Sequence, residues 1–255
     1  MSNTTHAKRT IPFAWALIAT MALGVGPPLA SAAAAAETTT VSSGPALSAK
    51  QQSIVPIAAE MAVGNLPQLN AALNRGLDAG LSVSDIKEIL IQLYAYTGFP
   101  RSLNALGELM KVLDARKQRG IQDPAGREPT PIPPSSDMLT LGTANQTKLL
   151  GQPARALLYE FAPSIDDFLK RHLFGDIFAR DNLDWQSREL ATVGALAAMP
   201  GVESQLQSHI AVSLNVGLTA AQLRQLAAVL GEAGQADAAA RTRVALERHL
   251  ASPAK

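Results

Sequence analysis

The chain has 255 residues, a formal net charge of +1 and no cysteine. The near-neutral charge gives no electrostatic basis for binding nucleic acid or an anionic membrane surface. Because there is no cysteine, disulfides are excluded and stability has to come from an ordinary hydrophobic core.

The first 32 residues have the pattern of a secretory signal peptide. Residues 6–9 (HAKR) form a positive start, residues 11–25 are an apolar run, and residues 30–32 (ASA) are a small-x-small cleavage site. A membrane anchor is the alternative, but the apolar run is short for a bilayer span and a cleavage site follows it. We therefore expect residues 1–32 to be removed and the chain to be periplasmic or secreted. The mature chain would have a net charge of about −1 and no membrane partner.

Two low-complexity stretches separate the helical parts of the chain. Residues 33–46 are rich in Ala, Thr and Ser, which predicts a disordered tail. Five prolines between residues 123 and 136 predict an extended linker, which we place at residues 121–140. In the remaining segments, 47–120 (module 1) and 141–250 (module 2), apolar residues recur at helical spacing and no run alternates with period two. The sequence therefore predicts an all-α fold.

The two helical segments repeat each other. LDAGLSVSDIKEIL (77–90) aligns with LNVGLTAAQLRQLA (214–227), 137 residues further along the chain. Upstream, residues 47–69 match residues 183–206 with a slip of one residue. We therefore expect two tandem copies of one helical module, one in each segment.

The ends of the repeated helices can be placed from their capping residues. In each copy a helix ends at a glycine that suits the left-handed C′ position, Gly80 or Gly217. Two residues later comes an N-cap, followed at the third position by Asp85 or Gln222, which makes an approximate capping box. The predicted N-caps are Ser48, Ser82, Asp184 and Thr219.

Module 2 carries a candidate acid–base pair. The sequence predicts a helix over residues 185–199, a Pro-Gly break at residues 200–201 and a second helix over residues 202–216. Glu189 lies on the first helix and His209 on the second, so antiparallel packing would bring the carboxylate and the imidazole together. Such a pair is a workable general acid–base unit near neutral pH. The alternative is a surface carboxylate and a hydrogen-bonded structural histidine.

Module 1 does not repeat this pair, because Ser53 stands in place of Glu189 and Ala72 in place of His209. If the fold of the module needed this pair, both modules would keep it. Its loss from module 1 therefore favours a functional role, specific to that site, for the pair in module 2. The sequence has no glycine-rich phosphate loop, no His-x-x-x-His or Glu-x-x-His spacing and no Gly-x-Ser-x-Gly turn. We therefore expect no cofactor and no resident metal, although a Glu/His metal site completed across an oligomer interface stays open.

Two segments carry a resemblance to a known family. These are RELATVGALAAMPGVESQLQSHIAVSLNVGLT (188–219) and LDAGLSVSDIKEILIQLYAYTGFPRSLNAL (77–106). They resemble the carboxymuconolactone decarboxylase family, which shares its fold with alkylhydroperoxidase D, over about residues 47–120 and 165–235. The resemblance implies two tandem alkylhydroperoxidase D-like modules, of which module 1 is degenerate. It also implies oligomers, often trimers or hexamers of single modules. Because this chain carries two modules, we expect a trimer-like homo-oligomer with fewer chains per ring than single-module members have.

The resemblance also bears on the chemistry. The peroxidase branch of the family carries a glutamate, then Cys-x-x-Cys, then a histidine four residues after the second cysteine. His209 matches that histidine and Glu189 matches the glutamate within one residue, whereas Val202 and Gln205 stand where the cysteines would be. A thiol peroxidase needs a thiolate nucleophile. Peroxiredoxin-type activity is therefore excluded in its usual form.

The decarboxylase branch needs no cysteine. There a bound lactone acid loses carbon dioxide and leaves a carbanion delocalised into a carbonyl group. By resemblance, His209 would carry the proton or contact the oxyanion, and Glu189 would orient it or act as an acid. Arg188 would anchor a substrate carboxylate or, alternatively, face solvent. Gln205 and His172 complete the predicted substrate-binding set, with a structural or exposed role as the alternative for His172.

The aromatic side chains near the repeated segments are expected to support the fold. Tyr94, Tyr96 and Phe99 are predicted to pack in the core or between the modules, with ligand contact as the alternative. Trp185, at the start of a helix, is predicted to anchor that helix against the neighbouring module.

These patterns lead to two hypotheses of function. The first is an exported lyase that uses Glu/His acid–base chemistry on a small carboxylated lactone or oxo acid. The second is a non-catalytic binding or assembly protein on the same scaffold, which the degenerate module 1 favours. Export fits poorly with intracellular aromatic catabolism, the usual setting of the named decarboxylase, so we expect a different substrate.

Overall fold

Helices make up all the regular structure of the described part of the chain. The structure is a computed structural model that describes residues 46–252. The predicted signal peptide and nearly all of the predicted tail lie outside the described residues. No strand occurs between residues 46 and 252, which confirms the all-α prediction.

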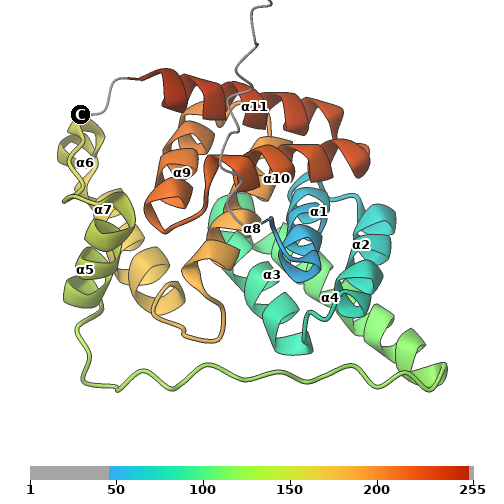
Figure 1. Cartoon of the computed structure of the whole chain (residues 1–255). Coiled ribbons are helices and arrows are strands. Elements are labelled where there is room, and N and C mark those ends of the chain that lie inside the picture. Colours follow the sequence, from blue (N-terminus) through green and yellow to red (C-terminus); the bar gives the residue numbers. More distant parts are fainter. Residues whose placement is uncertain (1–45, 253–255) are drawn as a thin grey trace, which may run out of the picture. The chain divides into compact units, whose positions relative to one another are not determined.

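Two sets of helices follow each other in the same order, one set in each half of the chain (Figure 1). The first set is α1 (Ala49–Val63), α2 (Leu66–Asp78), α3 (Val83–Thr97) and α4 (Phe99–Gln118). The second set is α8 (Trp185–Ala198), α9 (Glu203–Asn215), α10 (Ala220–Glu232) and α11 (Ala236–Ala251). Between the sets lie α5 (Met138–Leu150), α6 (Leu157–Phe161), α7 (Pro163–Phe168) and a π-helix, η1 (Leu169–Ile177).

Capping residues end and begin the repeated helices as predicted. The Ser82 hydroxyl accepts a hydrogen bond from the Asp85 N–H while the Asp85 carboxylate accepts from the Ser82 N–H, a full capping box that Thr219 and Gln222 repeat. A glycine with positive φ precedes each box, at +92° in the first copy and +97° in the second. All four predicted N-caps accept a backbone N–H in their helix: Ser48, Ser82, Asp184 and Thr219.

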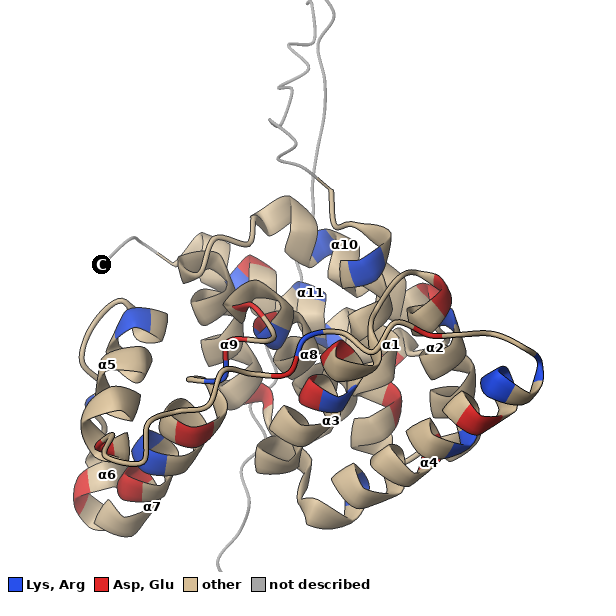
Figure 2. Ribbon diagram, turned by 90° about the horizontal axis from the view of Figure 1, so that it is seen from below, with Lys and Arg blue, Asp and Glu red and all other residues tan. Residues whose placement is uncertain are grey.

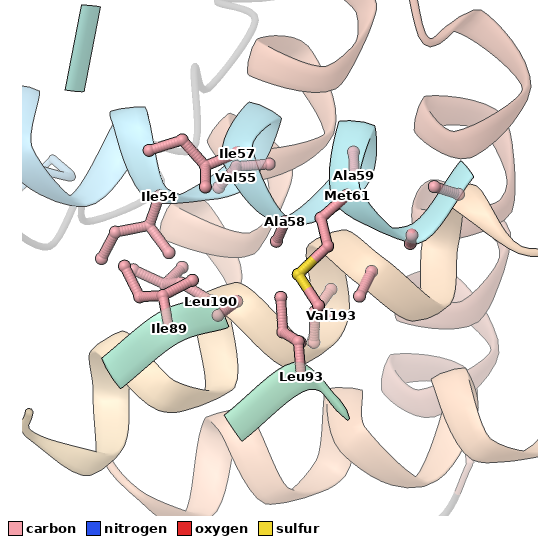
Figure 3. Close-up of a cluster of buried hydrophobic side chains, with 14 of the residues drawn as sticks. Ile54, Val55, Ile57, Ala58, Ala59, Met61, Ile89, Leu93, Leu190 and Val193 are labelled. Carbon is pink, nitrogen blue, oxygen red and sulfur yellow. The ribbon is translucent and has the colours of Figure 1, made fainter. Parts of the chain in front are cut away.

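One hydrophobic core joins the two halves. α1 packs along α8, α3 packs against α8, and α10 packs against α1, so each half covers helices of the other. Gly194 lies where α8 meets α1, and a Cβ there would stand 3.0 Å from the Val55 carbonyl oxygen, so glycine permits this close approach. Each large side chain buried here stabilises the fold by about 1.5–3 kcal/mol. Figure 3 shows side chains of both halves packed together: Ile54, Met61, Ile89, Leu93, Leu190 and Val193.

A second, smaller hydrophobic cluster holds α5 and η1 against α8 and α9. Its buried side chains are Leu149, Leu173, Ile177, Phe178 and Val212. α5 and η1 lie so close that a Cβ on Gly142 would overlap the Lys170 carbonyl oxygen. Trp185 packs against the same elements, because its indole N–H donates to the Phe178 carbonyl oxygen and Lys148 Nζ lies 4.7 Å from its ring centre. These two partners belong to its own half, but the same cluster includes Tyr94 and Tyr96 of module 1, so anchoring of Trp185 against the neighbouring module stays a prediction.

Residues 121–137 of the predicted linker form no helix and are mostly exposed. The linker is held along its length, because Arg116 binds Asp123, the Ser84 hydroxyl donates to the Arg127 carbonyl oxygen, and both Arg127 and Thr130 bond to Asp181. α5 begins at Met138, so the last residues of the predicted linker are helical. Within residues 46–252, no helix combines the length and apolarity that crossing a bilayer requires.

Candidate functional site

The site of interest lies between α8 and α9. Asp184 caps the start of α8 and places Glu189 in its second turn, on a helix whose residues 187–198 are all buried. After α8 the chain reverses at Gly201, whose φ of +83° suits glycine. α9 then packs back along α8 and carries His209 past Glu189.

The predicted contact between Glu189 and His209 is confirmed. Glu189 Oε2 lies 2.8 Å from His209 Nδ1. The Glu189 side chain is 0% exposed and the His209 side chain is 16% exposed. Because a carboxylate accepts at Nδ1, the hydrogen of the neutral imidazole sits on Nδ1 and leaves Nε2 as the free nitrogen. None of the hydrogen bonds of the described residues involves His209 Nε2, so this ring nitrogen is left to bond a ligand.

A tyrosine from the other half completes the surroundings of His209. Tyr96 lies in the last turn of α3, and its ring meets the His209 ring edge-on with centroids 5.5 Å apart. Burial raises the pKa of the Tyr96 hydroxyl and the charge of Glu189 raises it further, so the hydroxyl stays protonated at neutral pH. The sequence predicts packing between the modules for Tyr96, and its contact with His209 adds a polar group to the site.

Several polar atoms near this contact are buried without a hydrogen-bond partner. They are Glu189 Oε1, Tyr96 Oη and, one turn after His209 on α9, Ser213 Oγ. A buried polar atom left without a partner costs about 1–3 kcal/mol, and such atoms are rare in folded proteins. Their accumulation around one histidine is typical of a place that receives a ligand or ordered water.

Arg188 precedes Glu189 but points into a different environment. Its side chain is 0% exposed, with Nη2 2.8 Å from Glu88 Oε1 and Nη1 2.9 Å from Gln92 Oε1. The alternative role for Arg188, facing solvent, is therefore wrong. Its terminal nitrogens are occupied within the protein, whereas its Nε is buried without a partner, so anchoring of a substrate carboxylate by Arg188 stays a prediction.

Glu88 is the centre of this buried ion network between the halves. It also binds Arg180, which follows η1, with Arg180 Nη2 2.9 Å from Glu88 Oε2. Burial alone would raise the pKa of Glu88, but the hydrogen bonds and charges of Arg180 and Arg188 outweigh it and hold the pKa below its usual range. Burial lowers the pKa of Arg188, and Glu88 opposes that shift. We assign this network to the contact between α3 and α8.

The other predicted binding residues lie outside the Glu189–His209 contact. Gln205 is exposed, one turn before His209 on α9. His172 is exposed on η1, where its Nδ1 lies 2.7 Å from Asp176 Oδ2, and none of its described contacts is with the pair. Substrate binding by Gln205 and His172 stays a prediction.

The remaining aromatic residues lie beside His172. The Tyr94 ring lies 5.5 Å from the His172 ring and stacks on the Phe99 ring at 4.4 Å. Tyr94 and Tyr96 both pack against the cluster around α5 and η1, as expected for contact between the modules. Phe99 is 62% exposed and does not pack in the core, so for this residue only packing between the modules stays a prediction.

Module 1 has no acid–base pair at the equivalent place. The Ser53 hydroxyl donates to the Lys50 carbonyl oxygen, and Ala72 is fully buried. Among the described residues, no three His, Cys, Asp or Glu side chains come together in a way that could hold a metal ion.

Comparison with known proteins agrees with this architecture. The model of the carboxymuconolactone decarboxylase family matches residues 27–110 and 163–248, which together are most of the chain. This chain belongs to the carboxymuconolactone decarboxylase family. The two matched regions confirm the tandem arrangement, and they place Tyr96 in the first region and the Glu189–His209 pair in the second.

One curated relative is similar to part of the chain. It is a 4-carboxymuconolactone decarboxylase of Acinetobacter baylyi, 30% identical over 89 residues. The alignment covers 33% of this chain and 66% of that relative, so the similarity is to roughly one module and not to the tandem chain.

Proposed function

We propose that module 2 is a lyase site that decarboxylates a small carboxylated lactone or oxo acid by acid–base chemistry. One observation carries the proposal: a fully buried carboxylate holds the Nδ1 side of an imidazole whose Nε2 makes no hydrogen bond to the described residues. This is the arrangement in which a histidine transfers a proton at Nε2 while the carboxylate fixes its orientation. Membership of the family and the named activity of the Acinetobacter relative support the choice of reaction.

His209 and Glu189 have separate roles in the proposed decarboxylation. The bond between carbon and the substrate carboxylate breaks, carbon dioxide leaves, and the electron pair moves into a conjugated carbonyl group to give an enolate. The imidazolium of His209 then donates its Nε2 proton to that carbon, and solvent returns a proton to the ring. Glu189 stabilises the imidazolium through the Nδ1 hydrogen. Proton transfer by a positioned side chain contributes about 10²–10⁴-fold to the rate.

The proposal includes export and self-association. The signal-peptide pattern of residues 1–32 supports a periplasmic or secreted location. Large apolar side chains exposed on α4, α6 and α7 support a homo-oligomer, with three chains as the expected number. They include Phe99, Leu103, Met110, Leu157, Phe161 and Phe168. In Figure 2 basic and acidic residues are interspersed on the helices, which supports a small molecule rather than nucleic acid as the ligand.

The test compares wild-type protein with His209→Gln on a panel of carboxylated lactones and oxo acids, with carbon dioxide release as the readout. Glutamine keeps an N–H for Glu189, so the buried carboxylate is not left unpaired. We expect release by the wild type and a loss of at least about 100-fold in the variant. His249→Gln, in the last turn of α11, is the matched control and should keep full activity.

A non-catalytic binding or assembly protein is the second candidate function. The loss of the pair from module 1 and the exposed apolar side chains favour it. If folded wild type releases carbon dioxide from no member of the panel, the lyase proposal fails and this candidate takes its place.

A further inference from the structure

We infer that Tyr96 is a catalytic residue of this site, and that its hydroxyl donates a hydrogen bond to the carbonyl oxygen of the substrate. The juxtaposition that carries the inference joins Tyr96 of α3 with Glu189 and His209 of the other half. The site would then be built from both modules, and neither module would hold a complete one. The inference rests on the proposed function, and the experiment below separates the two.

The position of the tyrosine is fixed from two sides. The Tyr96 ring packs against the main core on one side and against the cluster around α5 and η1 on the other. Its ring plane makes an angle of 78° with that of His209. A ring packed in this way has little rotational freedom, so the hydroxyl is presented at one place beside the imidazole.

The hydrogen-bonding groups left free at this place are complementary to a substrate. Tyr96 Oη is buried and makes no hydrogen bond of normal geometry, although the Thr192 hydroxyl lies near enough to oppose the rise that burial gives its pKa, and Glu189 Oε1 is an acceptor without a partner. They come from different halves of the chain and both lie beside His209. A carbonyl oxygen would satisfy the tyrosine, and a hydroxyl or an enol hydrogen on the same substrate would satisfy Glu189.

A protonated phenol suits the charge that decarboxylation creates. As the carboxylate leaves, the electron pair of the broken bond becomes the double bond of an enolate, and negative charge collects on the former carbonyl oxygen. A neutral O–H directed at that oxygen stabilises the charge without being consumed. Because burial and Glu189 keep the hydroxyl protonated, it is available as this donor. His209 then protonates carbon, and the carbonyl group is restored.

This arrangement narrows the class of substrate. The donor can act only if the carbonyl oxygen receives the electron pair, so the carbonyl has to be adjacent to, or conjugated with, the carbon that bears the carboxylate. The structure therefore points to β-oxo acids and their vinylogous lactone counterparts. Simple monocarboxylic acids that lack such a carbonyl are not expected to react.

Module 1 provides an independent comparison. The repeat offset of 137 residues places Ala233 opposite Tyr96, as it places Ala72 opposite His209. Ser53 and Ala233 line one surface groove between α1 and the end of α10, so the two equivalent positions face the same groove. The positions equivalent to Glu189, His209 and Tyr96 thus all carry small residues, as expected if the three side chains act as one set.

The test uses the full chain and Tyr96→Phe, which keeps the packed ring and removes only the oxygen. Tyr94→Phe is the matched control, since Tyr94 is two residues earlier on α3 and contacts Phe99 and His172 instead of the pair. We measure kcat and KM for carbon dioxide release from β-oxo acids, thermal unfolding, and the affinity for oxalate, a planar mimic of an enolate. We expect kcat of Tyr96→Phe to fall about 10²–10³-fold with little change in KM. Oxalate should bind at least tenfold more weakly, while Tyr94→Phe behaves as wild type.

Each other outcome overturns the inference. If Tyr96→Phe keeps kcat within threefold while His209→Gln loses it, the proposed function stands and the role of Tyr96 fails. If Tyr96→Phe lowers the melting temperature by more than about 5 °C, its hydroxyl has a structural partner and the inference is wrong. If wild type releases no carbon dioxide from any β-oxo acid, the proposed function fails and the inference falls with it.

Discussion

Glu88→Gln should destabilise the fold strongly, because it removes the negative charge at the centre of the buried ion network. The Glu88 side chain is 1% exposed and faces Arg188, which is 0% exposed, so water cannot replace the lost partner. Removing one partner of a buried ion pair costs about 3–5 kcal/mol. Glutamine still offers one oxygen to the guanidinium groups. We therefore expect the free energy of unfolding to fall by an amount near the lower end of this range, about 3 kcal/mol. For a chain of this size that corresponds to a fall in melting temperature of about 6–12 °C.

Thermal unfolding followed by circular dichroism at pH 7 measures this loss. Glu247→Gln is the matched control, because Glu247 also pairs with an arginine but is 61% exposed. Its effect should stay below about 1 kcal/mol. A melting temperature of Glu88→Gln within about 2 °C of wild type would refute the view that this network holds α3 against α8.

The same carboxylate predicts a pH dependence. Because the folded-state pKa of Glu88 is lowered, its stabilising contribution is complete above the unfolded pKa of about 4.3 and is lost as the pH falls through the folded pKa. The difference in melting temperature between wild type and Glu88→Gln should therefore be largest at neutral pH and shrink below about pH 4. An equal difference at pH 7 and pH 3 would contradict this linkage.

Two further predictions concern packing and export. Gly142→Ala should lower the free energy of unfolding by about 1–3 kcal/mol, because the new Cβ overlaps the Lys170 carbonyl oxygen where α5 meets η1. The control is Gly107→Ala, whose Cβ meets nothing within 4 Å, so its melting temperature should be unchanged or slightly raised. Equal melting temperatures for the two variants would argue against this packing. Cell fractionation and mass spectrometry should find a periplasmic or secreted chain that begins near Ala33, whereas an intact N-terminus in the cytoplasm would exclude a cleaved signal peptide.

The parts of the fold that follow from local chemistry could be predicted from the sequence. Ser82 and Thr219 begin helices because a hydroxyl three residues from a carboxylate or amide forms a capping box within one turn. The contact between Glu189 and His209 was predictable for a similar reason, since a short Pro-Gly break joins their helices and forces them to pack side by side.

Contacts between the halves could not be predicted in this way. Arg188 is bound to Glu88, 100 residues earlier, and α8 is buried on almost every side, so no polar face in its sequence indicates where Arg188 points. The contact of Tyr96 with His209 depends on how α3 of one half packs against the other half. Periodicity identifies a buried face but does not identify its partner.

The most direct test of the central claim is solvent-deuterium incorporation by NMR, in D₂O, at the carbon that loses the carboxylate. If His209 delivers the proton while Glu189 holds its imidazole, wild type should form product with one deuterium at that carbon. The His209→Gln variant should form essentially no deuterated product. Equal deuterium incorporation by the two folded proteins would contradict proton transfer by His209 and leave its contact with Glu189 a structural one.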